Sequence, residues 1–154
     1  MTRSTRFRSS ISSASSQWMA GAAAGLVSTV VMTGVLVGSE RAGFMPGQPP
    51  RTIIDRLLPG LNDRTADLVA LATHLGYGAA AGIAGSVVLP RRARGRVVRG
   101  AAYGLVLWAV GYEVWVPLIQ ALPPAHRDEP KRVLTMIAGH LVFGSTLALC
   151  GATR

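Results

Sequence analysis

Two histidines and one glutamate are the residues of this chain whose types could carry chemistry within a membrane. His74 and His140 each stand in a long apolar stretch, and Glu113 is the single acidic residue of another. Histidine titrates near neutrality, and a carboxyl group in an apolar environment can titrate in the same range. Because an ionisable residue is costly to place at membrane depth, the three residues predict a polar cluster that relays protons or holds a small cation or polar solute.

Two other interpretations of the histidines stay open. A neutral histidine that hydrogen-bonds across a pair of helices stabilises their packing by about 0.5–2 kcal/mol without any chemistry. Alternatively, His74 and His140 could ligate a haem iron from both sides, since Gly78 and Gly144 follow four residues later and leave room for the ring. The chain has no haem-attachment motif and no cysteine–histidine spacing typical of zinc, so no cofactor is predicted otherwise.

The residues expected to support the cluster are Asp67, Tyr77, Tyr112 and Pro117. Asp67 falls seven residues before His74, on the same face of a helix. Pro117 lacks the amide hydrogen that would bond the carbonyl group of Glu113, so we expect a kink at this position. At 1.5 Å per residue, His74, His140 and Glu113 are predicted to lie about 9–14 Å below the same membrane surface.

The elements that must position these residues are four apolar helices. The chain has 154 residues, of which 49% are hydrophobic, and four stretches of it are nearly free of charge. Each stretch reaches the roughly 20 residues that a helix needs to cross a bilayer, where helices satisfy their own backbone polar groups. We therefore expect an all-α integral membrane four-helix bundle with spans over 17–38, 65–89, 100–122 and 131–152. Residues 1–16, which are basic and rich in serine, are expected to form a disordered tail.

The bundle is expected to consist of two repeated transmembrane hairpins. Residues 72–78 and 138–144 share alanine, histidine, leucine and glycine at matching positions, and residues 21–27 differ from residues 100–106 at a single position. Small residues four apart let helix backbones approach closely in lipid. The glycines expected at such contacts are Gly21, Gly25, Gly78, Gly82, Gly100, Gly104 and Gly144.

Basic residues indicate how the bundle is oriented and what it meets. The link between the second and third spans contains Arg91, Arg92, Arg94, Arg96 and Arg99. Because cytoplasmic segments retain positive charge, both termini are predicted to be cytoplasmic, with the multi-pass protein in the plasma (inner) membrane. Arginines in this position are expected to contact anionic lipids, and the formal net charge of +9 is therefore not taken as a sign of nucleic-acid binding.

The loop between the first two spans is predicted to contain a short amphipathic helix over 51–58. Ile53, Ile54 and Leu57 fall on one side of it, and Arg51 and Arg56 fall on the other. Such a helix could lie in the outer headgroup layer or form a lid against the mouth of the bundle.

The arrangement resembles a group of small bacterial inner-membrane proteins, the YagU-like type. The resemblance is carried by the glycine-rich first span (21–31), by the acid and prolines after it (Glu40, Pro46, Pro49 and Pro50) and by the motif 139–142 in the last span. It implies a bacterial plasma membrane and no assigned enzyme activity, and it supplies no catalytic residues.

The sequence predicts a non-enzymatic polytopic membrane protein, and homo-oligomers are compatible with it. Motifs of serine hydrolases, phosphate-binding loops and metalloproteases are missing from the chain. The leading hypothesis is a bundle whose layer of His74, His140 and Glu113 fixes the helix packing and could also move protons, a small cation or a solute. The alternative is a haem-binding electron-transfer protein.

Overall fold

The computed structural model describes the backbone of residues 3–89 and 94–151 and the side chains of residues 15–89 and 94–151. All regular structure in these residues is helical, which confirms the predicted fold class. Four helical stretches, Ser15–Arg41, Asp63–Val88, Arg96–Leu118 and Pro130–Cys150, are long and apolar enough to cross a membrane. The elements in order are α1 (Arg3–Arg41), α2 (Pro49–Leu57), α3 (Asp63–Val88), α4 (Arg96–Trp108), η1 (Ala109–Trp115), α5 (Val116–Leu118), η2 (Ala125–Arg127) and α6 (Pro130–Cys150).

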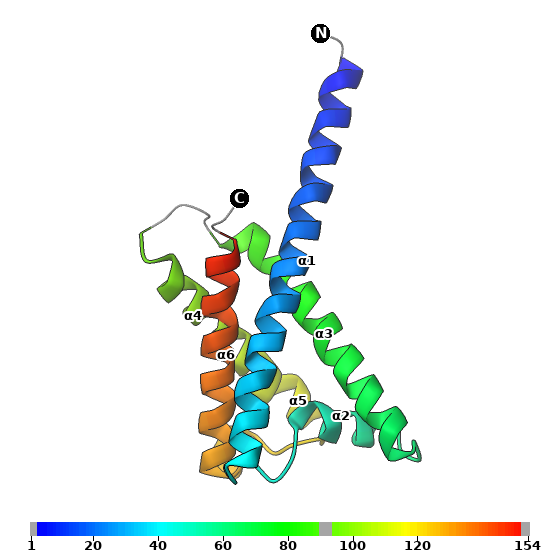
Figure 1. Cartoon of the computed structure of the whole chain (residues 1–154), viewed down its shortest axis with the longest axis vertical. Coiled ribbons are helices and arrows are strands. Elements are labelled where there is room, and N and C mark those ends of the chain that lie inside the picture. Colours follow the sequence, from blue (N-terminus) through cyan, green and yellow to red (C-terminus); the bar gives the residue numbers. More distant parts are fainter. Residues whose placement is uncertain (1–2, 90–93, 152–154) are drawn as a thin grey trace.

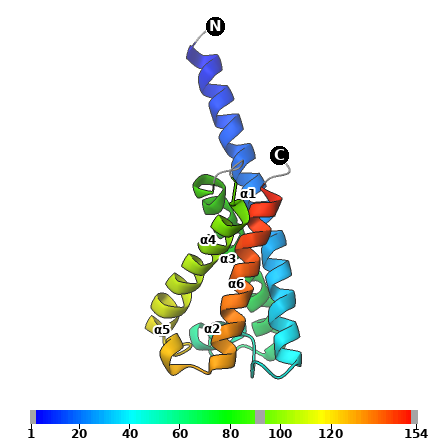
Figure 2. The same ribbon diagram turned by 90° about the vertical axis from the view of Figure 1, so that its left-hand side faces the viewer.

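Helix α1 packs between α3 and α6, and α4 packs on α6 (Figure 1). The spans come together at the end where α6 finishes, which we call the terminal end. Toward the opposite end α3 slants away from α1, and the continuous helix α4–η1–α5 slants away from α6 (Figure 2). The short helix α2 lies at this second end, the α2 end, so the bundle is a wedge with α2 across its wide side.

The crossing of α1 and α3 is lined by glycine and lies nearer the terminal end. A Cβ atom on Gly25 would overlap the carbonyl oxygen of Gly78, and one on Gly82 would overlap that of Gly21. No side chain separates the two backbones there, so each helix contacts the other along its peptide groups. In lipid, where apolar side chains gain little by leaving their surroundings, this close van der Waals packing holds helices together.

The crossing of α4 and α6 is built in the same way. A Cβ atom on Gly104 would overlap the carbonyl oxygen of His140, and one on Gly144 would overlap that of Gly100. The seven glycines expected at helix contacts therefore lie at these two crossings. At each crossing, one helix carries a copy of the repeat 21–27/100–106 and the other carries a copy of the repeat 72–78/138–144.

The third span contains a π-helical segment where the sequence predicts a kink. In η1 the chain is wound more widely, and the amide of Val116 donates to the carbonyl oxygen of Gly111, five residues back. Pro117 follows directly and has no amide hydrogen to restore the ordinary α-helical pattern. The span ends at Leu118, before the predicted residue 122, because Gln120 takes a left-handed conformation with φ 58° that a helix cannot continue through.

The first helix begins at Arg3, so the serine-rich segment expected to be a disordered tail continues the span as helix. Adding a residue to an existing helix forms one hydrogen bond for each residue ordered, which is far easier than starting a helix. Polar composition alone therefore does not predict where this helix begins.

We predict that Gly25→Ala destabilises the bundle by about 1–3 kcal/mol, the usual cost of overpacking a tight contact. The matched control is Gly34→Ala on the same helix, where a Cβ atom meets nothing within 4 Å. Because alanine favours helix over glycine by about 1 kcal/mol, this control should be neutral or slightly stabilising. The fraction of monodisperse protein left after heating in detergent measures both, and equal melting curves would contradict the close crossing.

Candidate functional site

A cavity of about 240 Å³ lies between the diverging helices. Its walls come from α1, α3, α4–η1 and α6, and residues of α2 line its end. Most of the lining is apolar, and none of the described lining residues has a charged side chain. The lining side chains with polar atoms are Thr29, Thr73, His74, Tyr77, Tyr112, Trp115 and His140.

The cavity exists because α3 and α4 meet only near the terminal end. There the hydroxyl group of Tyr103 donates to the carbonyl oxygen of Ala81 at 2.7 Å. Between α1 and α6, in contrast, Met32 and Leu36 fill the space beside Gly139 at 3.3–3.4 Å from the position of its missing Cβ. Further toward α2, no hydrogen bond between described residues joins α3 to η1 or α5, and the cavity occupies the space between them.

Both predicted histidines line this cavity, one from α3 and one from α6. The Nδ1 atom of His140 lies 2.8 Å from the carbonyl oxygen of Met136 in its own helix. Since a carbonyl group can only accept, Nδ1 carries the hydrogen, and in the neutral ring Nε2 is left with a lone pair. The Nε2 atom of His74 is buried and has no hydrogen-bond partner among the described residues. The structure therefore places two imidazoles at one cavity, each with an unused nitrogen.

Glu113 is not part of this cavity. Its side chain is exposed, and its carboxylate accepts a hydrogen bond from the amide of Ala125 at 3.2 Å, in the loop before α6. Gly104 faces α6 from the other side of the same helix, so Glu113 is directed away from the bundle centre. The structure thus brings together two of the three residues predicted to form a polar cluster.

The expected supporting residues are divided between two places. Tyr77 and Tyr112 line the cavity, whereas Pro117 is not among its lining residues. Asp67 lies near the start of α3, where it is exposed and pairs with Arg51 at 2.6 Å. Asp67 was predicted to support His74, but in the structure it attaches α2 to α3.

A buried polar network at the α2 end was not predicted. Tyr112 donates its hydroxyl hydrogen to the carboxylate of Asp128, which also pairs with Arg132 at 2.7 Å, and the Asp128 side chain is only 4% exposed. Tyr112 also stacks on Trp108 with ring centroids 5.9 Å apart. The spacing of Asp128 and Arg132, four residues apart at a helix start, was the available signal. The network holds Tyr112 in place in the cavity wall.

Helix α2 lies at the wide end of the cavity, the place that the lid alternative for segment 51–58 predicts. Its residues Ile53, Ile54 and Leu57 line the cavity, and Ile54 is only 4% exposed. The helix begins at Pro49, earlier than predicted, because proline suits the first turn of a helix, where no amide hydrogen bond is needed.

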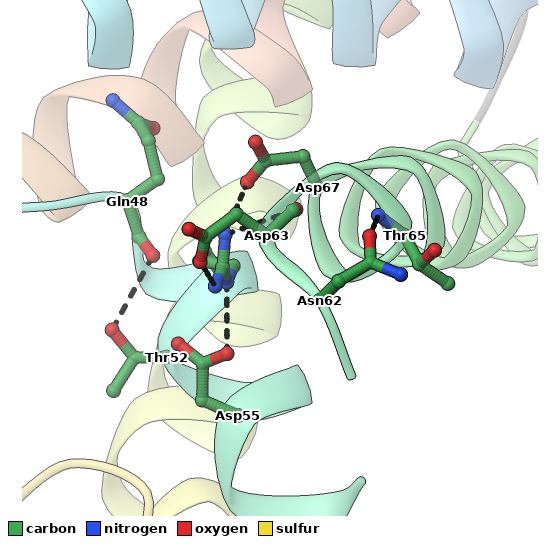
Figure 3. Close-up of polar contacts among 8 residues, drawn as sticks. Gln48, Thr52, Asp55, Asn62, Asp63, Thr65 and Asp67 are labelled. Atoms are coloured by element: carbon green, nitrogen blue, oxygen red, sulfur yellow. Dashed lines mark hydrogen bonds and ion pairs between the residues drawn. The ribbon is translucent and has the colours of Figure 1, made fainter. Parts of the chain in front are cut away.

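Two arginines attach α2 to α3 and to the residues that follow α5. Arg51 bonds Asp55 in its own helix and Asp63 and Asp67 in α3, at 2.6–2.9 Å (Figure 3). These three carboxylates raise the pKa of Arg51 above its already high usual value, so the arginine is charged at any working pH. Arg56 donates to the carbonyl oxygen of Ile119 at 3.0 Å and to the Gln120 side chain at 2.7 Å.

The basic link lies at the terminal end, away from the cavity. Arg94 and Arg99 are exposed and Arg96 is partly buried at the start of α4. Arg91 and Arg92 lie outside the described residues. Contact of this link with anionic lipid stays a prediction.

Comparison with known proteins finds no family model that matches the chain and no curated protein or solved structure that is similar to it. The described residues contain no group of three or more histidine, cysteine, aspartate or glutamate side chains arranged to hold a metal ion.

We predict that His74→Phe raises the stability of the protein by about 1 kcal/mol. The phenyl ring keeps the apolar contacts and removes a buried nitrogen that has no partner, whose desolvation costs about 1–3 kcal/mol. His126→Phe, at an exposed position in η2, is the control and should leave stability unchanged. Thermal melting in detergent measures both. A lower melting temperature for His74→Phe would instead favour a packing role for this histidine.

We predict that Arg51→Gln loosens α2 and exposes the cavity. In a protein carrying Ile54→Cys and Cys150→Ser, the single remaining thiol should react with a maleimide several-fold faster when Arg51 is replaced. High salt should have a similar effect, because it screens partly exposed ion pairs. Arg64→Gln, at an exposed position next to Asp63, is the control. Equal rates in the Arg51 variant and the control would show that α2 is held by its apolar face alone.

Proposed function

We propose that this chain is a non-enzymatic multi-pass membrane protein that holds a small uncharged solute in the cavity beneath α2. The observation that carries the proposal is an apolar cavity of about 240 Å³ with two imidazoles in its wall. An engineered protein cavity of about 150 Å³ is large enough to bind benzene, so this one has room for a substituted ring. Binding sites for small molecules share this design, in which mostly apolar walls carry a few polar groups.

The cavity favours a neutral solute over a proton or a cation. A cation taken from water into an apolar site needs anionic or several oxygen ligands to offset its lost hydration. The described lining offers no carboxylate, and Glu113 faces away from it. A neutral molecule loses little hydration and gains contact with the apolar wall.

The haem-binding alternative is not supported. Sites for cofactors have volumes of about 300–1,000 Å³, so a haem between His74 and His140 would require the helices to move apart. The α2 lid, held by Arg51 and Arg56, stands against such a movement.

The proposed setting is a bacterial plasma membrane, with the terminal end and its arginines on the cytoplasmic side next to anionic lipids. The positive bias of this end supports the orientation, and the YagU-like resemblance supports the kind of membrane. We further propose that the two hairpins arose by duplication. The supporting observation is that equivalent glycines, Gly25 with Gly78 and Gly104 with Gly144, lie at the crossing within each hairpin.

Fluorobenzene is a suitable probe, because its fluorine resonance reports binding without a label on the protein. We expect wild-type protein in lipid nanodiscs to shift and broaden the ¹⁹F resonance of fluorobenzene beyond the effect of empty nanodiscs. Gly111→Leu should abolish this extra effect. Gly111 lines the cavity and a Cβ there meets only Trp115 at 3.5 Å, so the larger side chain extends into the empty space.

Gly76→Leu is the matched control on α3, at an exposed position where a Cβ meets nothing within 4 Å. It should bind fluorobenzene as the wild type does. The same resonance in wild-type protein, in Gly111→Leu and in empty nanodiscs would overturn the proposal.

A further inference from the structure

Three of the four hydroxyl groups in the cavity wall have already used their hydrogens, and the fourth, on Tyr77, has no hydrogen-bond partner among the described residues. Thr29 donates to the carbonyl oxygen of Gly25 at 2.8 Å, and Thr73 donates to that of Val69, each within its own helix. Tyr112 donates to the carboxylate of Asp128. A hydroxyl group has one hydrogen and two lone pairs, so these three groups present only lone pairs to the cavity.

His140 adds an acceptor that is stronger and held in one orientation. Its Nδ1–H group is bound to the Met136 carbonyl oxygen at 2.8 Å, which fixes both the tautomer and the direction of the ring. The free lone pair is on Nε2, on the side of the ring away from its own helix. His74, on α3, has a nitrogen without a hydrogen-bond partner, and a neutral imidazole has one donor and one acceptor nitrogen.

From this arrangement we propose that the cavity selects an uncharged lipophilic molecule with a hydroxyl group, such as a phenol, whose O–H donates to Nε2 of His140. This inference rests on the proposed function and names the chemical class of its solute. An ether or a ketone, which can only accept, would leave Nε2 of His140 unpaired. A charged molecule would find no counter-charge among the described lining residues.

Aromatic side chains in the cavity wall favour a ligand that itself carries an aromatic ring, such as a phenol. Tyr112, Phe143 and Trp115 line the cavity and come from η1 and α6. Aromatic side chains pack well against a ring of similar size in offset or edge-to-face contact. The hydroxyl group of a phenol would thus be placed near the histidines while its ring contacts these residues.

The test compares 4-fluorophenol with 4-fluoroanisole, which has the same ring and an oxygen without the hydrogen. Binding of each to protein in nanodiscs is followed by ¹⁹F resonance. His140→Phe keeps a ring of similar volume and removes the acceptor. We expect this substitution to weaken the binding of 4-fluorophenol about fivefold, the effect of one net hydrogen bond, and to leave the binding of 4-fluoroanisole unchanged. Comparing the two proteins for each probe cancels its partitioning into lipid.

A second measurement does not depend on a variant. In wild-type protein with ¹⁵N-labelled histidine, saturating 4-fluorophenol should shift the Nε2 resonance of His140 toward that of a hydrogen-bonded nitrogen, and 4-fluoroanisole should not. If both probes bind but neither the resonance nor the affinity distinguishes them, the hydroxyl preference is wrong while the cavity function stands. If neither probe nor fluorobenzene binds, the proposed function itself is wrong.

Discussion

Direct contact between helix backbones at two glycine crossings is the constraint on which the rest of this structure depends. Where Gly25 meets Gly78 and Gly104 meets Gly144, no side chain separates the helices, and their backbones are in direct contact. Toward α2 the same helices carry larger side chains, among them Met32, Leu36 and Met136, which need more room. Because the helices are in close contact near one end and diverge toward the other, the bundle has the shape of a wedge. A space is left between the four diverging helices.

That space is unevenly filled. Side chains of α1 close the gap to α6 beside Gly139, whereas α3 and α4 separate beyond the Tyr103–Ala81 hydrogen bond. The loop between the first two spans supplies what the second hairpin lacks, a helix whose apolar face meets the opening and whose arginines reach to both sides. The two hairpins are otherwise similar, and the helix α2 in the loop of the first one covers the cavity.

Polar groups around the cavity follow from the same geometry. In this uncharged wall, the hydroxyl groups of Thr29 and Thr73 donate hydrogen bonds to carbonyl oxygens of their own helices. The imidazole of His140 is satisfied on one side only, and that of His74 keeps a nitrogen without a partner. Unused polar atoms at an apolar cavity are costly unless something else meets them, which is the physical ground for regarding this place as a binding site.

Local composition was enough to predict the spans, their number, the glycines of the crossings and the amphipathic character of α2. These features depend on hydropathy over about 20 residues and on spacing along one helix, both of which can be read without knowing the neighbours. The sequence also predicts that His74, His140 and Glu113 lie at one depth, and this stays a prediction. The direction in which each side chain points across the bundle was not predictable, because it depends on which faces of the helices meet. Tertiary packing alone turned Glu113 outward, paired Asp67 with Arg51, placed α2 over the opening and formed the cavity that both histidines line.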